Sequence, residues 1–319
     1  MKTGTSFIQG RLAANTDLLA EQGLLFPGGA RWATQVRGIS DLIGGKHHGS
    51  GAWAELSAQV DGHDGTAIIS MEYLAAVGRP AIERLRDRFP SSEVRAVMTV
   101  RDLGRAVPSQ WQESVKNRAT RSWEEYVEGI RRHDEAGRPF WRQQGADRIA
   151  ARWAEVLGAA DVHVVTVPPP GSPSHLLWDR FAEVAGIGPA AWHRSTRSNP
   201  SLGAASTEVL RLLNLATPDQ PQAKSRVKRL ARRIIAAQAE PEDMIGFEPP
   251  AWLHDEADRI VAALTEGGYP VAGDLAELRP VAVPGVDPGS QSDAVRLDAA
   301  VRALGAVLFA EAAGDADDD

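Results

Sequence analysis

The 319-residue sequence contains no cysteine and no long uninterrupted apolar run. Without cysteine the chain can form no disulfide, no thiolate metal site and no cysteine nucleophile, so its chemistry must come from oxygen and nitrogen groups. No stretch approaches the roughly 18 consecutive apolar residues of a membrane span, and the first residues include no apolar segment like that of a signal peptide. These absences predict a globular protein without a membrane span, with the cytoplasm as its default compartment.

The formal net charge of −7 argues against a nucleic-acid-binding protein, although it leaves room for a local basic pocket that holds an anion. The histidines show no spacing typical of metal ligands, and we expect no metal site. Most of them are scattered singly along the chain: His63, His133, His163, His175, His193 and His254.

Three short runs rich in β-branched residues predict buried strands, at Thr66–Ser70, Val94–Val100 and Val162–Val167. Amphipathic helical patterns separate them, at Tyr73–Arg88 and Trp141–Leu157. Because strands and helices alternate, we expect an α/β fold with a short parallel sheet.

The domain division follows the composition. Residues 1–275 are expected to form one domain that includes a helix at Ser206–Leu215, and residues 276–294, rich in Pro, Gly, Ser and Asp, are expected to form a linker. Residues 295–319 predict a helical C-terminal extension, with a helix over Val295–Glu311 and an acidic tail.

A small polar loop, Lys2-Thr3-Gly4-Thr5-Ser6, comes directly before an apolar stripe at helical spacing. The free N–H groups and the dipole of a helix start favour a phosphate, glycine permits close backbone approach, and the lysine adds positive charge. The lysine precedes the glycine, so this is not the G-x-x-x-x-G-K-[ST] loop of nucleoside triphosphatases. The alternative is an unstructured terminus followed by an ordinary Thr or Ser helix cap.

A second candidate anion site follows the predicted strand Val94–Val100. Arg101 comes at the carboxyl end of that strand, where open parallel sheets bind ligands, and Ser109 follows eight positions later. The alternatives are a surface ion pair of Arg101 with Asp102 or Glu113, and a helix-capping role for Ser109.

The stretch from Lys2 to Gln9, followed by Gly23 and Phe26-Pro27, resembles the opening of bacterial sulfotransferase-like proteins, which use 3′-phosphoadenosine 5′-phosphosulfate (PAPS). Arg101 with Ser109 is similar to the family's 3′-phosphate motif. The resemblance spans about the first 215 residues. It implies a P-loop-like three-layer α/β/α fold and a sulfotransferase that modifies a hydroxyl or amine of a carbohydrate or small metabolite.

The resemblance also implies roles for individual residues. Lys2, Thr3, Gly4, Thr5 and Ser6 would hold the 5′-phosphosulfate, with Lys2 acting on the transferred group. Arg197 would be a further contact for the 3′-phosphate or the adenosine, its alternative being a solvated arginine before an Asn-Pro turn. The family has a buried strand directly before the lysine, where this sequence has only Met1. We therefore expect either a start of translation further upstream or a shortened copy.

Sulfuryl transfer needs a base that accepts the acceptor's proton. Glu72 follows the strand Thr66–Ser70 and is the first candidate, whereas His47 and His48, in a glycine-rich loop, are the second. The simpler alternatives are a first-turn carboxylate at a helix start and a solvated loop. Two rival functions remain open: a non-catalytic nucleotide-binding protein of the same fold, and a P-loop phosphotransferase, which would need the triphosphate loop that is missing here.

Overall fold

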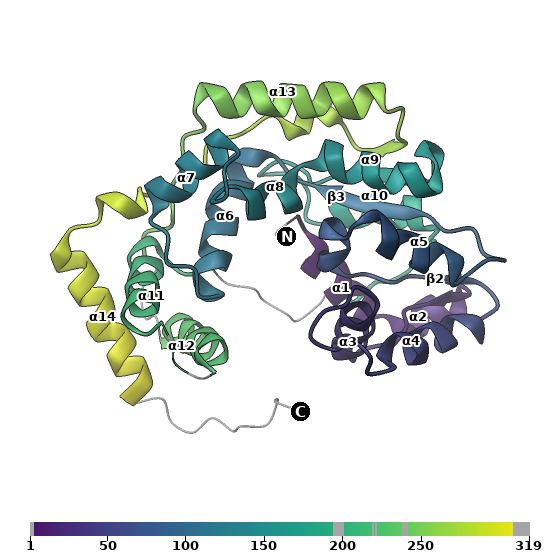
Figure 1. Ribbon diagram of the computed structural model, residues 1–319, viewed down its shortest axis with the longest axis horizontal. Helices are drawn as coiled ribbons and strands as arrows, with labels where there is room; N and C mark the ends of the chain where they lie inside the picture. Colours follow the sequence, from purple (N-terminus) through teal and green to yellow (C-terminus); the bar gives the residue numbers. More distant parts are fainter. Residues whose placement is uncertain (1–2, 194–200, 219, 221, 238–241, 309–319) are drawn as a thin grey trace. The chain divides into compact units, whose positions relative to one another are not determined.

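The computed structural model describes residues 3–193, 201–218, 220, 222–237 and 242–308. The chain forms two compact units that alternate along the sequence (Figure 1). The first unit comprises Met1–Leu103, Phe140–Ser198 and His254–Arg279, and the second comprises Gly104–Pro139, Asn199–Leu253 and Pro280–Asp319. This division differs from the sequence-based one, in which residues 1–275 form a single domain.

The first unit contains the strands that the structure describes, in two parallel sheets. One pairs β1 (Leu24–Leu25) with β2 (Thr66–Ala67), and the other has the order β3 (Ala96–Val100), β4 (Val162–Thr166), β5 (Val271–Ala272). All three predicted strands are present, and the α/β class with short parallel sheets is confirmed. β2 is shorter than predicted, because only the first two residues of Thr66–Ser70 pair with β1.

Helices surround these strands in the first unit. They are α1 (Thr5–Ala13), α2 (Thr16–Glu21), α3 (Trp32–Leu42), α4 (Ala52–Asp61), the 3-10 helix η1 (Glu72–Ala76), α5 (Arg79–Asp87), α9 (Ala146–Leu157), η2 (Ala159–Asp161), α10 (Leu176–Ala185) and η3 (Leu275–Leu278). Two further helices, α8 (Arg138–Gln144) and α13 (Ala251–Glu266), begin in the second unit.

Two predicted helices are each divided in two. The helix predicted at Tyr73–Arg88 is wrong as a single element. Gly78 is extended and separates η1 from α5, which begins at Arg79 with Pro80 in its first turn. The helix predicted at Trp141–Leu157 is interrupted at Gly145. A Cβ there would lie 2.8 Å from the carbonyl oxygen of Trp141, so the break between α8 and α9 needs glycine.

A hydrophobic core holds α1 against the β3-β4-β5 sheet. Ile8 and Leu12 of α1 pack with Val165 of β4 and with the aromatic face of α10. In α10, the Trp178 ring lies 5.3 Å from the Trp192 ring, and the guanidinium of Arg11 lies 5.0 Å from the centre of the Trp178 ring. The start of α1 is therefore fixed in position by burial of its first turns.

The second unit consists mainly of helices: α6 (Leu103–Lys116), α7 (Trp123–Arg132), α11 (Ala204–Ala216), α12 (Ala223–Ala237), η4 (Pro288–Ser290) and α14 (Asp293–Leu308). Edge-to-face aromatic contacts join Trp123 to Trp111 and to Phe247. The segment expected as a linker forms isolated bridges, Val283 with Phe247 and Val286 with Ile245.

Two helix predictions in the second unit are confirmed. α11 covers the helix predicted at Ser206–Leu215, and α14 covers the one predicted at Val295–Glu311 up to Leu308, after which the chain lies outside the described residues. Within the described part of the chain, no helix is both long enough and apolar enough to span a lipid bilayer.

Candidate functional site

The predicted loop opens directly into a helix, as expected. Gly4 has a left-handed backbone (φ +85°) and is the N-cap of α1, and no side chain caps the helix there. Its carbonyl accepts hydrogen bonds from the N–H groups of Phe7 and Ile8. The N–H groups of Thr5 and Ser6 come earlier in the chain and therefore have no acceptor within the helix. These two N–H groups and the helix dipole form a donor set suited to an anion.

Glycine is required at position 4 for two reasons. The positive φ is unfavourable for any residue with a Cβ, and a Cβ built on Gly4 would lie 2.5 Å from Cδ2 of Leu177 in α10. The loop therefore lies against the core of the first unit, with its backbone in close approach to α10.

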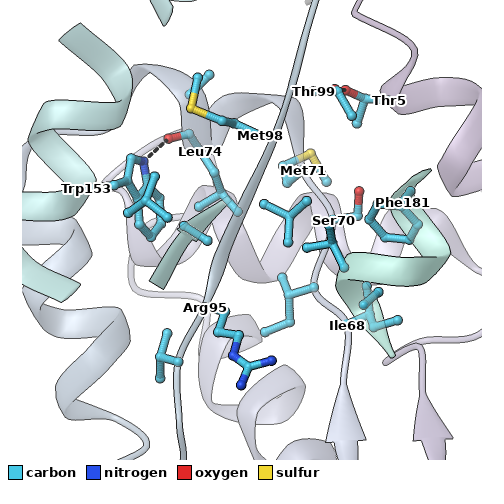
Figure 2. Close-up of a pocket in the computed structure, with 18 of the residues that line it drawn as sticks. Thr5, Ile68, Ser70, Met71, Leu74, Arg95, Met98, Thr99, Trp153 and Phe181 are labelled. Carbon is cyan, nitrogen blue, oxygen red and sulfur yellow. Dashed lines mark hydrogen bonds between the residues drawn. The ribbon is translucent and has the colours of Figure 1, made fainter. Parts of the chain in front are cut away.

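Three hydroxyl groups meet where the loop reaches the end of β3. Thr3 Oγ1 lies 3.1 Å from Thr99 Oγ1, and Thr5 Oγ1 lies 3.4 Å from each of them. Thr3 is buried, whereas Thr5 and Thr99 are half-buried. Figure 2 shows Thr5 and Thr99 side by side at one end of a cavity in the first unit. A hydroxyl can donate or accept, so this cluster can turn its protons toward a bound anion.

Glu72 lies on the other side of the loop, at the start of η1. Ser6 Oγ is 3.5 Å from Glu72 Oε1, and Gln9 Nε2 donates to the carbonyl of Ser70 at 2.9 Å. These contacts join the first turns of α1 to the segment that follows β2. The structure thus brings together four residues predicted to hold the phosphosulfate, Thr3 to Ser6, and the first candidate base.

The remaining predicted site residues lie elsewhere. His47 and His48 lie in the turns after α3, where the His47 N–H donates to Ser40 Oγ (3.3 Å) and His48 Nδ1 lies 3.4 Å from the carbonyl oxygen of Asp41. Lys2 and Arg197 lie outside the described residues.

The two residues of the predicted 3′-phosphate motif fall on either side of a unit boundary. Arg101 is half-buried and directly follows the last residue of β3 in the first unit. Ser109 is half-buried in the middle of α6, in the second unit, so it is not the N-cap of that helix.

The carboxyl end of β4 is filled by an internal ion pair. Arg180 of α10 donates to both carboxylate oxygens of Glu277, at 2.6 and 2.9 Å, and Thr166 Oγ1 donates to the same carboxylate at 2.6 Å. The hydrogen bond from Arg180 holds the pKa of Glu277 below its ordinary value. The candidate site therefore draws on the strand ends of β2 and β3, and not on that of β4.

Sequence reasoning missed Thr99 and the contact between Gln9 and Ser70. Thr99 is the one polar side chain within β3, two positions before Arg101, and a hydroxyl at the end of an apolar strand was the available signal. Gln9 gave no signal, because its role depends on the fold bringing residues 61 positions apart into contact.

Neither a metal site nor a similarity to a known protein assigns a function to these residues. Among the described residues, no three His, Asp or Glu side chains are grouped so that they could hold a metal ion. No protein-family model, curated protein or solved structure matches this chain.

Proposed function

We propose that this chain binds PAPS at the loop Thr3–Ser6 and transfers its sulfuryl group to a hydroxyl or amine of a carbohydrate or small metabolite. The observation that carries the proposal is the meeting of three features: a left-handed glycine that opens α1, the hydroxyl cluster at the end of β3, and the carboxylate of Glu72 beside Ser6. Anion donors and a base candidate thus lie on two sides of one short loop.

The donor set suits the phosphosulfate of PAPS. The N–H groups of Thr5 and Ser6 and the hydroxyl of Thr5 can each donate to an anionic oxygen, and Lys2, from the sequence, adds charge. Arg101, at the end of the same strand as Thr99, is the proposed partner of the 3′-phosphate, with Arg197 as a further proposed contact.

The reaction requires one bond exchange and one proton transfer. The acceptor oxygen or nitrogen forms a bond to sulfur, the bond between sulfur and the 5′-phosphate oxygen breaks, and 3′-phosphoadenosine 5′-phosphate leaves with the electron pair. The acceptor's proton passes to Glu72, with His47 and His48 as the alternative bases. Neutralising charge on the transferred group and the leaving phosphate is the main task of the loop.

The finer fold assignment belongs to the same proposal. The parallel order β3-β4-β5, with α9 and α10 packed against β4, supports a P-loop-like three-layer arrangement in the first unit. We also propose a cytoplasmic location, the default for a chain of this composition.

A second candidate is a nucleotide-binding protein without turnover. The cavity that separates β2 from β3 favours it, because the loop Thr3–Ser6 borders this open space and, among the described residues, contacts β3 only through the hydroxyl groups at Thr99. A P-loop phosphotransferase is the weaker rival, since it needs a triphosphate loop that this sequence lacks.

Calorimetry with 3′-phosphoadenosine 5′-phosphate tests the proposed nucleotide site. Arg101→Ala should weaken binding by more than about tenfold, because it removes a charged partner of the 3′-phosphate. Arg95→Ala is the matched control: Arg95 is an arginine at the opposite end of β3, exposed and paired with Glu93, and its loss should leave the affinity unchanged. Equal affinities for the two variants would refute the site, and tighter binding of ATP with Mg²⁺ would favour the phosphotransferase.

Turnover of PAPS separates the enzyme from the non-catalytic binder. With 2-naphthol and chitobiose as acceptor probes, Glu72→Gln should preserve nucleotide binding and lower the release of 3′-phosphoadenosine 5′-phosphate by about a hundredfold, the effect of losing a general base. Undiminished turnover would move the base to His47 or His48. Binding without turnover of either probe by the unsubstituted chain would favour the second candidate.

A further inference from the structure

A cavity of about 710 Å³ separates the two parallel sheets of the first unit. Residues of β2 and of the segment after it line one side, and residues of β3 line the other. We call it the β2–β3 cavity. Its further lining comes from α1, α9 and α10, including Ile8, Trp153 and Phe181.

Main-chain groups from both strands point into this cavity. The N–H groups of Thr66 and Ile68 donate to the carbonyls of Gly23 and Leu25, on the far side of β2 from the cavity. Because successive residues of a strand point their N–H and C=O groups to alternate sides, those of Ala67 and Ile69 point toward the cavity.

The same alternation applies to β3. The carbonyl of Val100 accepts the N–H of Val167, which continues β4, so the groups of Val97 and Thr99 point away from β4 and toward the cavity. Two parallel strands thus face each other with hydrogen-bonding edges across an open space. A strand placed between them would meet main-chain donors and acceptors on both of its edges.

The burial of β3 supports this interpretation. Its first four residues, Ala96 to Thr99, are only half-buried, whereas β4, its neighbour in the same sheet, is almost entirely buried. Strands of a parallel sheet that carry helices on both faces are normally buried along their length. β3 has the apolar sequence of such a strand, yet among the described residues it pairs with β4 alone.

The lining predicts an occupant that is apolar on both faces. In Figure 2, Trp153 of α9 and Phe181 of α10 lie on opposite sides of β3, and the aliphatic side chains of Ile68 and Leu74 complete the lining. A strand placed between β2 and β3 would therefore contact apolar side chains on each face, as the central strand of an α/β sheet does.

The direction of the occupant follows from the loop. β2 and β3 both end near the start of α1: Thr3 lies 3.1 Å from Thr99, and Gln9 contacts Ser70. A strand that ended at Thr3 would run parallel to both neighbours and would be followed at once by a helix, which is the usual connection in a parallel sheet.

We propose that the β2–β3 cavity holds a β-strand of about five apolar residues, supplied by polypeptide on the amino side of Thr3, paired in parallel with β2 and β3. The inference rests on the geometry of the first unit and is independent of the proposed sulfuryl transfer. A small apolar ligand in the same space is the competing occupant, and it would leave the strand edges without a regular pattern of pairing.

Hydrogen exchange on the full chain tests the proposal. One variant carries the added segment Val-Ile-Val-Val-Ile before Met1, and the control carries the same segment with proline at its second and fourth positions, which removes two N–H donors while keeping apolar character. With the apolar segment, exchange of the Val97, Thr99, Ala67 and Ile69 amides should slow by at least about tenfold. The Met98 amide, which points toward β4, should not change.

The melting temperature provides a second readout that does not need resolved amide signals. The apolar segment should raise it by about 5 °C or more, whereas the proline segment should raise it much less. If the unextended chain melts without a cooperative transition, the two extended variants are compared by the sharpness of their transitions. A sharp transition is then expected only for the variant with the apolar segment.

Three outcomes would overturn the proposal. Equal gains in exchange protection and melting temperature from the two segments would mean that the cavity is stabilised by apolar filling alone, without strand pairing. Slow exchange at Val97 and Thr99 in the unextended chain would mean that these edges are already paired. No change with either segment would mean that the cavity accepts no strand. Nucleotide binding is not a readout, so a failure here is distinct from a failure of the sulfotransferase proposal.

Discussion

The substitution Gly4→Ala tests how tightly the loop is held against the core of the first unit. Two costs are expected. A residue with a Cβ at φ +85° costs about 1–2 kcal/mol, partly offset by about 0.4–1 kcal/mol because alanine restricts the unfolded chain. The new Cβ also lies 2.5 Å from Cδ2 of Leu177, the end of a flexible side chain, and moving that side chain off its rotamer costs about 0.5–1.5 kcal/mol.

A second glycine separates the two costs. Gly44 has a similar backbone, with φ +74°, but no atom lies within 4 Å of a Cβ built on it. Gly44→Ala should therefore lower the free energy of unfolding by about 0.5–1 kcal/mol, the backbone cost alone. Gly4→Ala should lower it by about 1–2.5 kcal/mol, and the difference is the contact with Leu177.

Urea unfolding of both variants, alone and combined with Leu177→Ala, measures these free energies. In the Leu177→Ala background the extra cost at position 4 should disappear, which gives a coupling energy of about 0.5–1.5 kcal/mol. Gly44→Ala should show no coupling to Leu177→Ala. If Gly4→Ala and Gly44→Ala cost the same and neither is coupled to Leu177, the loop does not lie against α10 and the geometry of the candidate site is wrong.

The pKa shifts yield two further predictions. Glu277→Gln should destabilise the chain by about 1–3 kcal/mol near neutral pH, since it weakens the hydrogen bonds from Arg180 and Thr166. Because the folded-state pKa of Glu277 is lowered, its contribution to stability is present above about pH 4.3 and is lost as the pH falls through the folded value. Unfolding measured from pH 7 to pH 3 should therefore show a smaller loss of stability with acid in the variant than in the unsubstituted chain. Burial, with a smaller effect of Arg95, lowers the pKa of His163 and favours the neutral imidazole, so stability is lost as the pH falls below about 6.5. NMR titration of the imidazole should show a partial rise of that pKa in Arg95→Ala. An unchanged pKa would be evidence against any influence of Arg95.

Local patterns predicted the strands and the loop because those features depend on neighbours in sequence. The β-branched run at Val162–Val167 forms β4 almost as predicted, and the glycine before the apolar stripe of α1 begins the helix at Thr5. The division of the helix predicted at Tyr73–Arg88 was also signalled locally, by Gly78 and Pro80, but the apolar periodicity continued across them and concealed the break.

Features that depend on distant residues were beyond local patterns. β1 and β5 are two residues long and pair only because the chain folds back, so neither forms a recognisable apolar run. The chain passes from one unit to the other several times, and no change of composition marks the crossings near Leu103 and Pro139. The candidate site belongs to the same class: Thr99, Glu72 and the loop are close because three separate elements end at one place.

The β2–β3 cavity and the candidate anion site are physically linked through Thr99. Its hydroxyl contacts Thr3 of the loop, and its main-chain groups point into the cavity, so one residue belongs to both. A strand paired with β3 would fix the backbone of Thr99 and, by ending at Thr3, the start of the loop. The N–H groups of Thr5 and Ser6, which the burial of α1 already positions, would then be held more rigidly before an anion binds, which lowers the ordering cost of binding. Linkage requires the converse: an anion bound at the loop would stabilise the paired strand by the same free energy.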